Sequence, residues 1–359
     1  MRHSKTKDSN AAVPDEAARP AARSLTRRTV LAGLGAGAVS LGAFEAFAAP
    51  DPQTYVRKAV EAMQRYSIRR KEIDWAQFRA ATQAQAAAAK SLEDTYPAIR
   101  AALERLGDSH SLFLTPAKMK ELSGGPGSRG GRGGGQPPSG KRLEVPAGNP
   151  AGYMLVPAFA SLARADGNKF ADRVQGLMKE VDHSALAGWV VDLRGNSGGN
   201  MWPMVAGLGP LLGEGRVGAF VDPDGVTQPW FYRSGACGIS GRFISRVAAR
   251  ATKPYRLLNA DPKVAVLTGP VTASSGEAVA VAFRGRPKTM SFGAATAGVS
   301  TSNRMVRLSD GAGLFITDSV MADRTGHKYG ARIDPDEAVA AGAGDDPVLA
   351  AALAWLRAA

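Results

Sequence analysis

Two adjacent serines, Ser274 and Ser275, lie where a short apolar run gives way to a helical pattern, and this placement suits a nucleophile. Residues 264–267 read Val-Ala-Val-Leu, as expected of a buried strand, and the Gly and Pro that follow indicate a turn. Residues 277–283 then have the apolar pattern of a buried helix. A hydroxyl at such a junction lies beside free backbone N–H groups that can stabilise negative charge on a carbonyl oxygen. The alternative is a structural role, because Ser274 and Glu277 also fit a helix capping box.

A second segment that could carry chemistry follows the strand pattern of residues 188–193. It reads Asp-Leu-Arg-Gly-Asn-Ser-Gly-Gly over residues 192–199. Glycines allow positive φ and close approach of the backbone, so the N–H groups of this loop could point at an anion. The same glycines could form a plain strand-to-helix turn, but the Asp-Leu-Arg before them makes the segment more specific.

Together the two segments resemble the S41 family of serine peptidases, which includes the tail-specific and the tricorn core proteases. Three further segments match that family in order: Leu-Gly-Asp-Ser-His-Ser at 106–111, Gly-Ala-Ala-Thr-Ala-Gly at 293–298, and Ile-Asp-Pro-Asp at 333–336. The resemblance runs from about residue 51 to about residue 340. It implies hydrolysis of peptide bonds, with a peptide or an unfolded protein as the substrate.

The choice of general base separates two branches of that family. The tail-specific branch pairs its serine with a lysine, but the matching position here is Val299, and no lysine lies between Thr289 and Thr325. The tricorn-like branch uses a histidine with a serine directly before it, and Ser109 and His110 fit this pattern. The resemblance therefore predicts His110 as the general base and Ser109 as the residue that orients its ring.

The resemblance also predicts the remaining members of the site. Ser274 is the expected nucleophile because it lies three residues before Glu277, although the register against Ser275 is ambiguous by one residue. The backbone N–H groups of Gly198 and Ser275 are the expected oxyanion hole. The tricorn-like branch also carries an acidic residue in its catalytic relay, and the matching position here is about Tyr329, which is not acidic. The third member of the relay is therefore not identified. No metal-ligand cluster, phosphate-binding loop or dinucleotide fingerprint occurs, and we expect no metal or cofactor.

The N-terminal residues predict export. Arg27 and Arg28 precede a mild apolar run over residues 29–44, and Ala-Phe-Ala at 46–48 offers a cleavage site. The run is too short and too rich in glycine to span a bilayer comfortably, with an uncleaved anchor as the alternative. We expect a twin-arginine signal over residues 1–49, a periplasmic or secreted protein, and no stable membrane association after cleavage.

Charge and cysteine content limit the other partners. The formal net charge is +13, from 45 Lys and Arg against 32 Asp and Glu, but the basic residues are dispersed and no cluster of them is interleaved with aromatic residues. Nucleic acid is therefore not an expected partner. Cys237 is the single cysteine of the chain, which excludes an intrachain disulfide.

Alternating strand and helix patterns predict an α/β fold, which the family resemblance describes as a crotonase-like (ClpP/crotonase) core with an N-terminal helical segment. We divide the chain into a helical segment at 50–120 that carries His110, a Gly- and Pro-rich linker or flap at 121–146, and a peptidase core at 147–359. The linker leaves no room for a PDZ domain. The expected helices are 74–90, 98–106, 169–181, 201–212, 277–283 and 347–356, and the expected strands are 152–157, 188–193, 216–221, 230–233, 264–267, 289–292, 306–308 and 314–320, the last two as a hairpin.

Two other functions stay open at this point. The same fold could serve a non-catalytic protein that binds a hydrophobic ligand, or an esterase or amidase that uses the same nucleophile. The distance between His110 Nε2 and Ser274 Oγ discriminates the first of these from a catalytic role.

Overall fold

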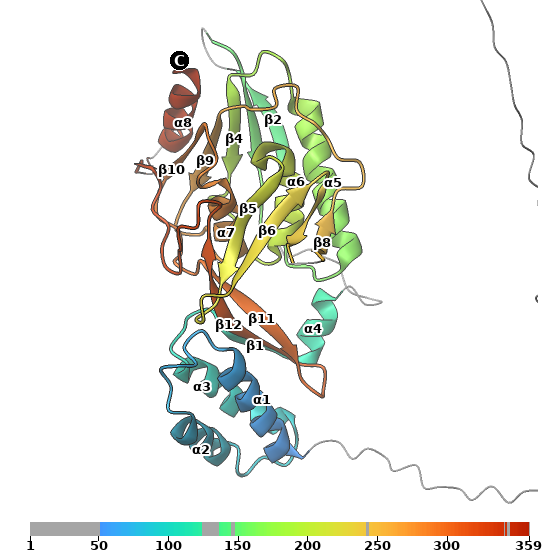
Figure 1. Ribbon diagram of the computed structural model, residues 1–359, viewed down its shortest axis with the longest axis vertical. Coiled ribbons are helices and arrows are strands. Elements are labelled where there is room, and N and C mark those ends of the chain that lie inside the picture. The colour runs from blue at the N-terminus through green and yellow to red at the C-terminus, as the bar shows by residue number, and fades with distance from the viewer. Residues whose placement is uncertain are drawn as a thin grey trace, which may run out of the picture. The chain divides into compact units, whose positions relative to one another are not determined.

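Two β-sheets with helices between them form the core of the computed structural model (Figure 1). The structure describes residues 51–123, 136–144, 148–241, 244–340, 342 and 345–358. The export signal that the sequence predicts over residues 1–49 lies outside these described residues. Within them, no helix is both long enough and apolar enough to cross a membrane.

The first sheet is mostly parallel and carries the nucleophile. Its order is β13-β10-β9-β4-β3-β2, with only β2 antiparallel to its neighbour. The central strands are short apolar runs that are buried on both faces, as is typical of parallel sheets. The bounds are β2 Ser139–Leu143, β3 Ala151–Leu155, β4 Gly188–Asp192, β9 Val264–Thr268, β10 Thr289–Gly293 and β13 Glu337–Ala338.

Helices cover both faces of this sheet because neighbouring residues of a strand point to opposite sides. Val191 contributes to the core that contains α5 (Arg164–Val181), α6 (Met201–Leu212) and α7 (Ser275–Phe283). The adjacent Val190 instead lies in the cluster formed with α8 (Pro347–Arg357). The three inner helices therefore separate the parallel sheet from the second sheet.

The second sheet is antiparallel and follows the order β1-β12-β5-β6-β7-β8, with β11 paired to β12. The predicted terminal hairpin is present as β11 and β12, which are longer than expected and contain a register shift between Ser302 and Asn303. The bounds are β1 Leu112–Leu114, β5 Gly215–Val221, β6 Thr227–Arg233, β7 Ala236–Ile239, β8 Arg246–Arg250, β11 Thr301–Arg307 and β12 Gly313–Ala322.

The N-terminal helices pack against one end of this second sheet (Figure 1). Their shared core joins Tyr55 and Ile99 of the helices to Phe113, Leu314 and Ile316 of the strands. Residues 49–359 group into one compact unit, so the helical segment that carries His110 belongs to the same unit as the peptidase core. The bounds are α1 Pro52–Tyr66, α2 Trp75–Gln85, η1 Glu93–Thr95, α3 Tyr96–Arg105 and α4 Pro116–Leu122.

The helix predicted over 74–90 is shorter than expected. Asp74 caps its start as predicted, accepting hydrogen bonds from the backbone N–H groups of Ala76 and Gln77, but α2 ends at Gln85. The Asp94 carboxylate accepts the backbone N–H groups of the residues at 90 and 91, which redirects the chain into the next helix. The alanine run after Gln85 thus forms a turn in place of a continued helix, despite its helix propensity.

The predicted linker over 121–146 is wrong for part of its length. Residues 139–143 form β2, paired along its whole length with β3, and Gly140 lies close to Met154, Leu177 and Val181. Backbone pairing to an existing sheet edge outweighs a composition that predicts no structure. The strands β7 and β8 and the short helix α4 are likewise absent from the sequence prediction, because their residues lack a clear apolar period.

Candidate active site

Ser274 lies at the tight turn between β9 and α7, as the sequence predicts. It is the residue that precedes the helix, and its φ of 51° and ψ of −112° are unusual for a residue with a side chain. A backbone of this kind costs about 1–3 kcal/mol and persists only where the surroundings enforce it. The side chain of Ser274 is half-buried, whereas Ser275 is only 8 % exposed and donates its hydroxyl to the Gly199 carbonyl over 2.8 Å.

The buried carboxylate of Glu277 holds this turn in place. Its Oε2 atom accepts the backbone N–H of Ser274 over 2.7 Å, so the carboxylate half of the predicted capping box is present. The same carboxylate accepts the Thr296 hydroxyl over 2.5 Å and the backbone N–H groups of Gly298 and Val299 over 3.0 Å each. Glu277 therefore joins the turn before α7 to the 296–299 segment, which the sequence singled out as a separate motif.

The glycine-rich loop after β4 lies directly against the serine turn. Asn196 accepts the backbone N–H of Ala273 with its carbonyl, and a Cβ on Gly276 would lie 2.4 Å from that same carbonyl oxygen. A Cβ on Gly198 would lie 2.9 Å from the Ser274 Cβ. The glycines of both motifs are thus required by close approach of two backbones, and the two motifs form one site.

His110 reaches this site from the N-terminal segment. Its Nε2 atom lies 2.8 Å from Ser274 Oγ, a hydrogen-bond distance across 164 residues of sequence. Asp108 fixes the turn by accepting the backbone N–H of His110 and both the N–H and the hydroxyl of Ser111. Asn303 adds a hydrogen bond of 2.8 Å from its amide nitrogen to the His110 carbonyl.

Thr301, rather than Ser109, contacts the other nitrogen of the ring. Thr301 Oγ1 lies 2.7 Å from His110 Nδ1, and Thr301 is buried, whereas Ser109 is exposed. The prediction that Ser109 orients the imidazole is therefore wrong in this geometry, because the turn held by Asp108 leaves the Ser109 side chain exposed while the His110 ring faces Ser274 and Thr301. Thr301 lies two residues beyond Val299, the position at which the sequence comparison looked for a lysine. Tyr329, the position expected to hold an acid, instead bonds Asp323.

The environment of His110 favours the neutral imidazole. Burial lowers the pKa of His110 below its ordinary value of 6.5, and the nearby charge of Asp108 opposes this shift only in part. A neutral ring can accept a proton at Nε2 while its Nδ1–H is donated to the Thr301 hydroxyl.

The two predicted oxyanion donors differ in availability. Gly198 donates its N–H to the side-chain oxygen of Asn196 over 3.0 Å, so in this geometry it is not free to bind a substrate oxygen. The N–H groups of Ser275 and Gly199 have no hydrogen-bond acceptor within the described part of the chain. Ser275 lies in the first turn of α7, where the helix dipole also favours negative charge.

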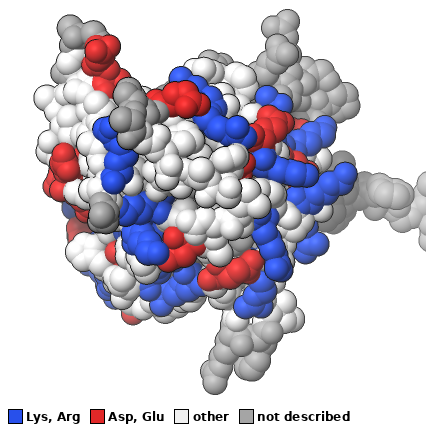
Figure 2. Space-filling view, turned by 90° about the horizontal axis from the view of Figure 1, so that it is seen from above, with Lys and Arg blue, Asp and Glu red and all other residues white. Residues whose placement is uncertain are grey.

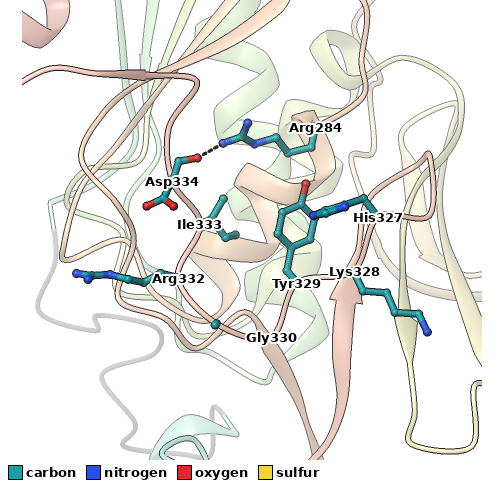
Figure 3. Close-up of a pocket in the computed structure, with 9 residues that line it drawn as sticks. Arg284, His327, Lys328, Tyr329, Gly330, Arg332, Ile333 and Asp334 are labelled. Atoms are coloured by element: carbon teal, nitrogen blue, oxygen red, sulfur yellow. Dashed lines mark hydrogen bonds between the residues drawn. The ribbon is translucent and has the colours of Figure 1, made fainter.

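The other described histidines are separate from Ser274. His183 is exposed and accepts the backbone N–H of Ala185. His327 lines a cavity of about 540 Å³ with Arg284, Tyr329 and neighbouring residues (Figure 3). Arg284 follows the last residue of α7, so this cavity lies at the end of the helix opposite to Ser274. Arg332 and Lys328 point away from each other in this view, and Arg284 donates to the Asp334 carbonyl, so the cations do not converge on one ligand.

The Asp-Leu-Arg motif before the glycine loop has a structural role that the sequence did not reveal. Buried Asp192 accepts the Tyr153 hydroxyl over 2.7 Å and Arg194 Nη2 over 2.6 Å. Arg194 also donates two hydrogen bonds, of 2.9 and 2.7 Å, to Asp346, which caps α8. The hydrogen bonds from Arg194 lower the pKa of Asp346. The motif thus attaches the C-terminal helix to the strand that leads into the active-site loop.

Comparison with known sequences decides the family. The sequence model of Peptidase family S41 matches residues 150–339, more than half of the chain. The chain belongs to Peptidase family S41. It is therefore a serine-type peptidase, a hydrolase whose substrates are peptides or proteins. The matched range contains Ser274, Glu277 and Thr301, and it begins beyond His110.

Relatives of this S41 peptidase share most of its length. It is 28 % identical over 280 residues to the Nisin-resistance protein of Lactococcus lactis subsp. lactis. The aligned region covers 78 % of this chain and 80 % of that protein. The structure is similar to that of a lipoprotein from Streptococcus agalactiae, with a TM-score of 0.68, 23 % identity, and coverage of 86 % of this chain and 96 % of the other. The structure is also similar to that of the photosystem II D1 C-terminal processing protease, with a TM-score of 0.53 and 18 % identity. That match covers 81 % of this chain and 94 % of the protease. At these identities the two structures indicate a shared fold.

Proposed function

We propose that this S41 peptidase is exported and cleaves peptide bonds through Ser274 as the nucleophile and His110 as the general base. The single observation that carries the proposal is the distance of 2.8 Å between His110 Nε2 and Ser274 Oγ. A nucleophile and a base within hydrogen-bond reach, with a third group on the far ring nitrogen, are the geometric signature of this chemistry. The buried hydroxyl of Ser275, bonded to Gly199, favours Ser274 over its neighbour as the nucleophile.

The reaction then proceeds in two stages. Ser274 Oγ attacks the carbonyl carbon as His110 Nε2 takes the hydroxyl proton, and the Ser275 and Gly199 N–H groups stabilise the oxyanion. Collapse of the tetrahedral intermediate breaks the C–N bond, His110 returns the proton to the leaving amine, and an acyl-enzyme remains. Water then attacks the ester by the same route and releases the acid and free Ser274.

Thr301 completes the relay in this proposal by accepting Nδ1–H of His110, which keeps Nε2 free to accept a proton. We expect Thr301→Val to lower kcat about fivefold with little change in KM, because a neutral hydrogen bond contributes about 1 kcal/mol. Thr301→Ser should restore most of the rate, since it returns the hydroxyl. Steady-state kinetics of the two variants measure this. A Thr301→Val enzyme with unchanged kcat would exclude an orienting role.

A histidine base favours the tricorn-like branch over the Ser/Lys arrangement of the tail-specific branch. Lys288, the lysine nearest to the expected dyad position, forms an exposed ion pair of 2.8 Å with Asp261 at the start of β10. Val299 instead donates its backbone N–H to Glu277. For the fold we propose a crotonase-like core at 147–359, with the base delivered by the 50–120 segment that contains His110.

The substrate we propose is a peptide or an unfolded protein segment. The name of the Nisin-resistance protein connects a sequence relative with resistance to nisin, so nisin belongs among the peptides to be tried. Nucleic acid is not proposed as a partner, in keeping with the mixture of basic and acidic side chains over the face in Figure 2. The short His110–Ser274 distance counts against a non-catalytic ligand-binding protein, and an esterase or amidase activity of the same site remains the second candidate.

A fluorophosphonate probe tests the function directly, because it reacts with an activated serine. We expect the probe to label the wild-type protein on Ser274 and to leave Ser274→Ala unlabelled. Cleavage of a peptide library by the same preparation, against simple esters as the comparison, separates a peptidase from an esterase. Absence of both labelling and cleavage in the wild-type protein would favour the ligand-binding function.

Export through the twin-arginine route is the second part of the proposal and rests on Arg27 and Arg28 of the sequence. Replacing both arginines by lysine should leave the precursor in the cytoplasm, because that route depends on the arginine pair. Cell fractionation with detection of the mature chain measures the outcome. Normal processing and export of the double variant would point to a general secretory signal instead.

A further inference from the structure

The strands β1, β12 and β11 form one end of the second sheet, and this end has two different faces (Figure 1). Phe113, Leu314 and Ile316 point into the core shared with the N-terminal helices. Because side chains alternate along a strand, Leu112 and Phe315 point to the opposite face. That opposite face also carries Thr317, whose hydroxyl lies 3.2 Å from that of Ser111, next to His110.

An exposed apolar row lies on this face, two strand residues from Thr317 and its contact with Ser111. Leu112 and Met305 are each the direct cross-strand partner of Phe315, so the three side chains are neighbours. Leu112 is 39 % exposed and Met305 is 47 % exposed. We call Leu112, Phe315 and Met305 the apolar row.

The neighbouring row of side chains holds the turn that contains His110. Asn303 pairs with Thr317 in the strand register, and Asn303 donates to the His110 carbonyl. Two residues of an extended strand span about 7 Å, so the apolar row lies about that distance from the side chains that hold His110. This is the length of one or two residues of a bound peptide.

Helix α4 limits the apolar row on its other side. Met119 of α4 is buried, and its sulfur would lie 2.4 Å from a Cβ placed on Gly313. Gly313 pairs with Leu114 and Arg307, in the row after the apolar one. The exposed apolar side chains are therefore confined between α4 and the His110 contact, and they end where the helix covers the sheet.

We propose that the apolar row binds an apolar side chain of the substrate on the C-terminal, leaving-group side of the scissile bond. This inference rests on the proposed roles of Ser274 and His110. In that mechanism His110 Nε2 returns the proton to the leaving amine, so His110 and the end of the sheet beside it face the residues that follow the cleaved bond. Within the described residues β11 pairs only with β12, so its outer edge has backbone groups for an extended peptide.

The experiment compares cleavage-site preferences of the wild-type protein and of a Leu112→Ser, Met305→Ser double variant. Each is incubated with an unbiased peptide library, and the products are identified by mass spectrometry. We expect the wild type to favour Leu, Met or Phe at the first or second position after the cleaved bond. The double variant should lose roughly tenfold of that preference, the usual scale for discrimination in an apolar pocket.

Two controls keep the result interpretable. Leu258→Ser changes another exposed leucine, 65 % accessible and outside this sheet, and should leave the preference unchanged. Fluorophosphonate labelling of the double variant shows whether Ser274 and His110 are still assembled. A labelled double variant that keeps the full preference, or that loses a preference before the cleaved bond instead, overturns the inference. A wild-type protein that is neither labelled nor active overturns the proposed function itself.

Discussion

Replacement of Ser274 by alanine is expected to lower peptide hydrolysis by roughly 10⁴- to 10⁶-fold, the range found when members of a serine protease triad are removed one at a time. The loss is large because Ser274 Oγ forms the bond to the substrate and is the atom that His110 Nε2 contacts. The remaining rate comes from substrate binding and from the backbone donors alone. The measurement is kcat/KM on one peptide found by library screening.

Ser275→Ala is the matched control for this prediction. It removes the neighbouring hydroxyl and its 2.8 Å hydrogen bond to Gly199, but it keeps the Ser275 backbone N–H. We expect a moderate loss of activity and of stability, with fluorophosphonate labelling of Ser274 preserved. An active Ser274→Ala protein together with an inactive Ser275→Ala protein would show that the nucleophile is the second serine of the pair.

Replacement of His110 by alanine is expected to cost a comparable factor, again roughly 10⁴- to 10⁶-fold in kcat, because base and nucleophile act as a unit. Lys288→Ala is the control, since this lysine is paired with Asp261 away from the site and should matter little. Circular dichroism and the midpoint of thermal unfolding establish that both variants are folded. Loss of activity in Lys288→Ala with retention in His110→Ala would restore a lysine base.

The pH profile of the wild-type enzyme gives an independent test of the same base. Burial lowers the pKa of His110, so the ring becomes protonated only at a pH below 6.5. A protonated ring cannot accept the serine proton, so kcat/KM should be constant above that value and fall as pH drops through the lowered pKa. The groups that face the ring are Asp108, whose charge raises this pKa, and the neutral hydroxyls of Thr301 and Ser274. An acid limb well above 6.5 would contradict a buried histidine base.

Local signals were sufficient to predict much of the core, whereas the two residues of the central contact were predicted from the family resemblance. The helix at 201–212 is present with its predicted bounds, and the strands at 188–193 and 264–267 differ by one residue at an end. These segments are apolar runs bounded by turn residues, where periodicity and tertiary burial agree. Ser274 and His110 were predicted because each stands in a short motif of the S41 family, and in the structure Glu277 and Asp108 of the same motifs hold their turns.

Contacts between distant segments were beyond the reach of the sequence. Thr301 contacts the His110 ring, which is 191 residues away in the sequence. A threonine in a strand pattern has no sequence feature that predicts such a contact. Ser109 was chosen by adjacency, although its side chain is exposed while the His110 ring turns toward Ser274. The strand β2 was missed for a related reason, because Ser-Gly-Lys-Arg-Leu becomes a strand only when β3 offers an edge to pair with.

The order of the three relay residues along the chain has a consequence for the timing of activity. His110 lies in the first third of the sequence, Ser274 in the last third, and Thr301 on a strand of the hairpin that follows Ser274. A nascent chain has the proposed base long before it has the proposed nucleophile, and Thr301 is made after both. In the proposed mechanism, the nascent chain therefore cannot cleave a peptide until the segment that carries Ser274 has been made and has packed against His110, and the Thr301 hydroxyl then raises the rate further.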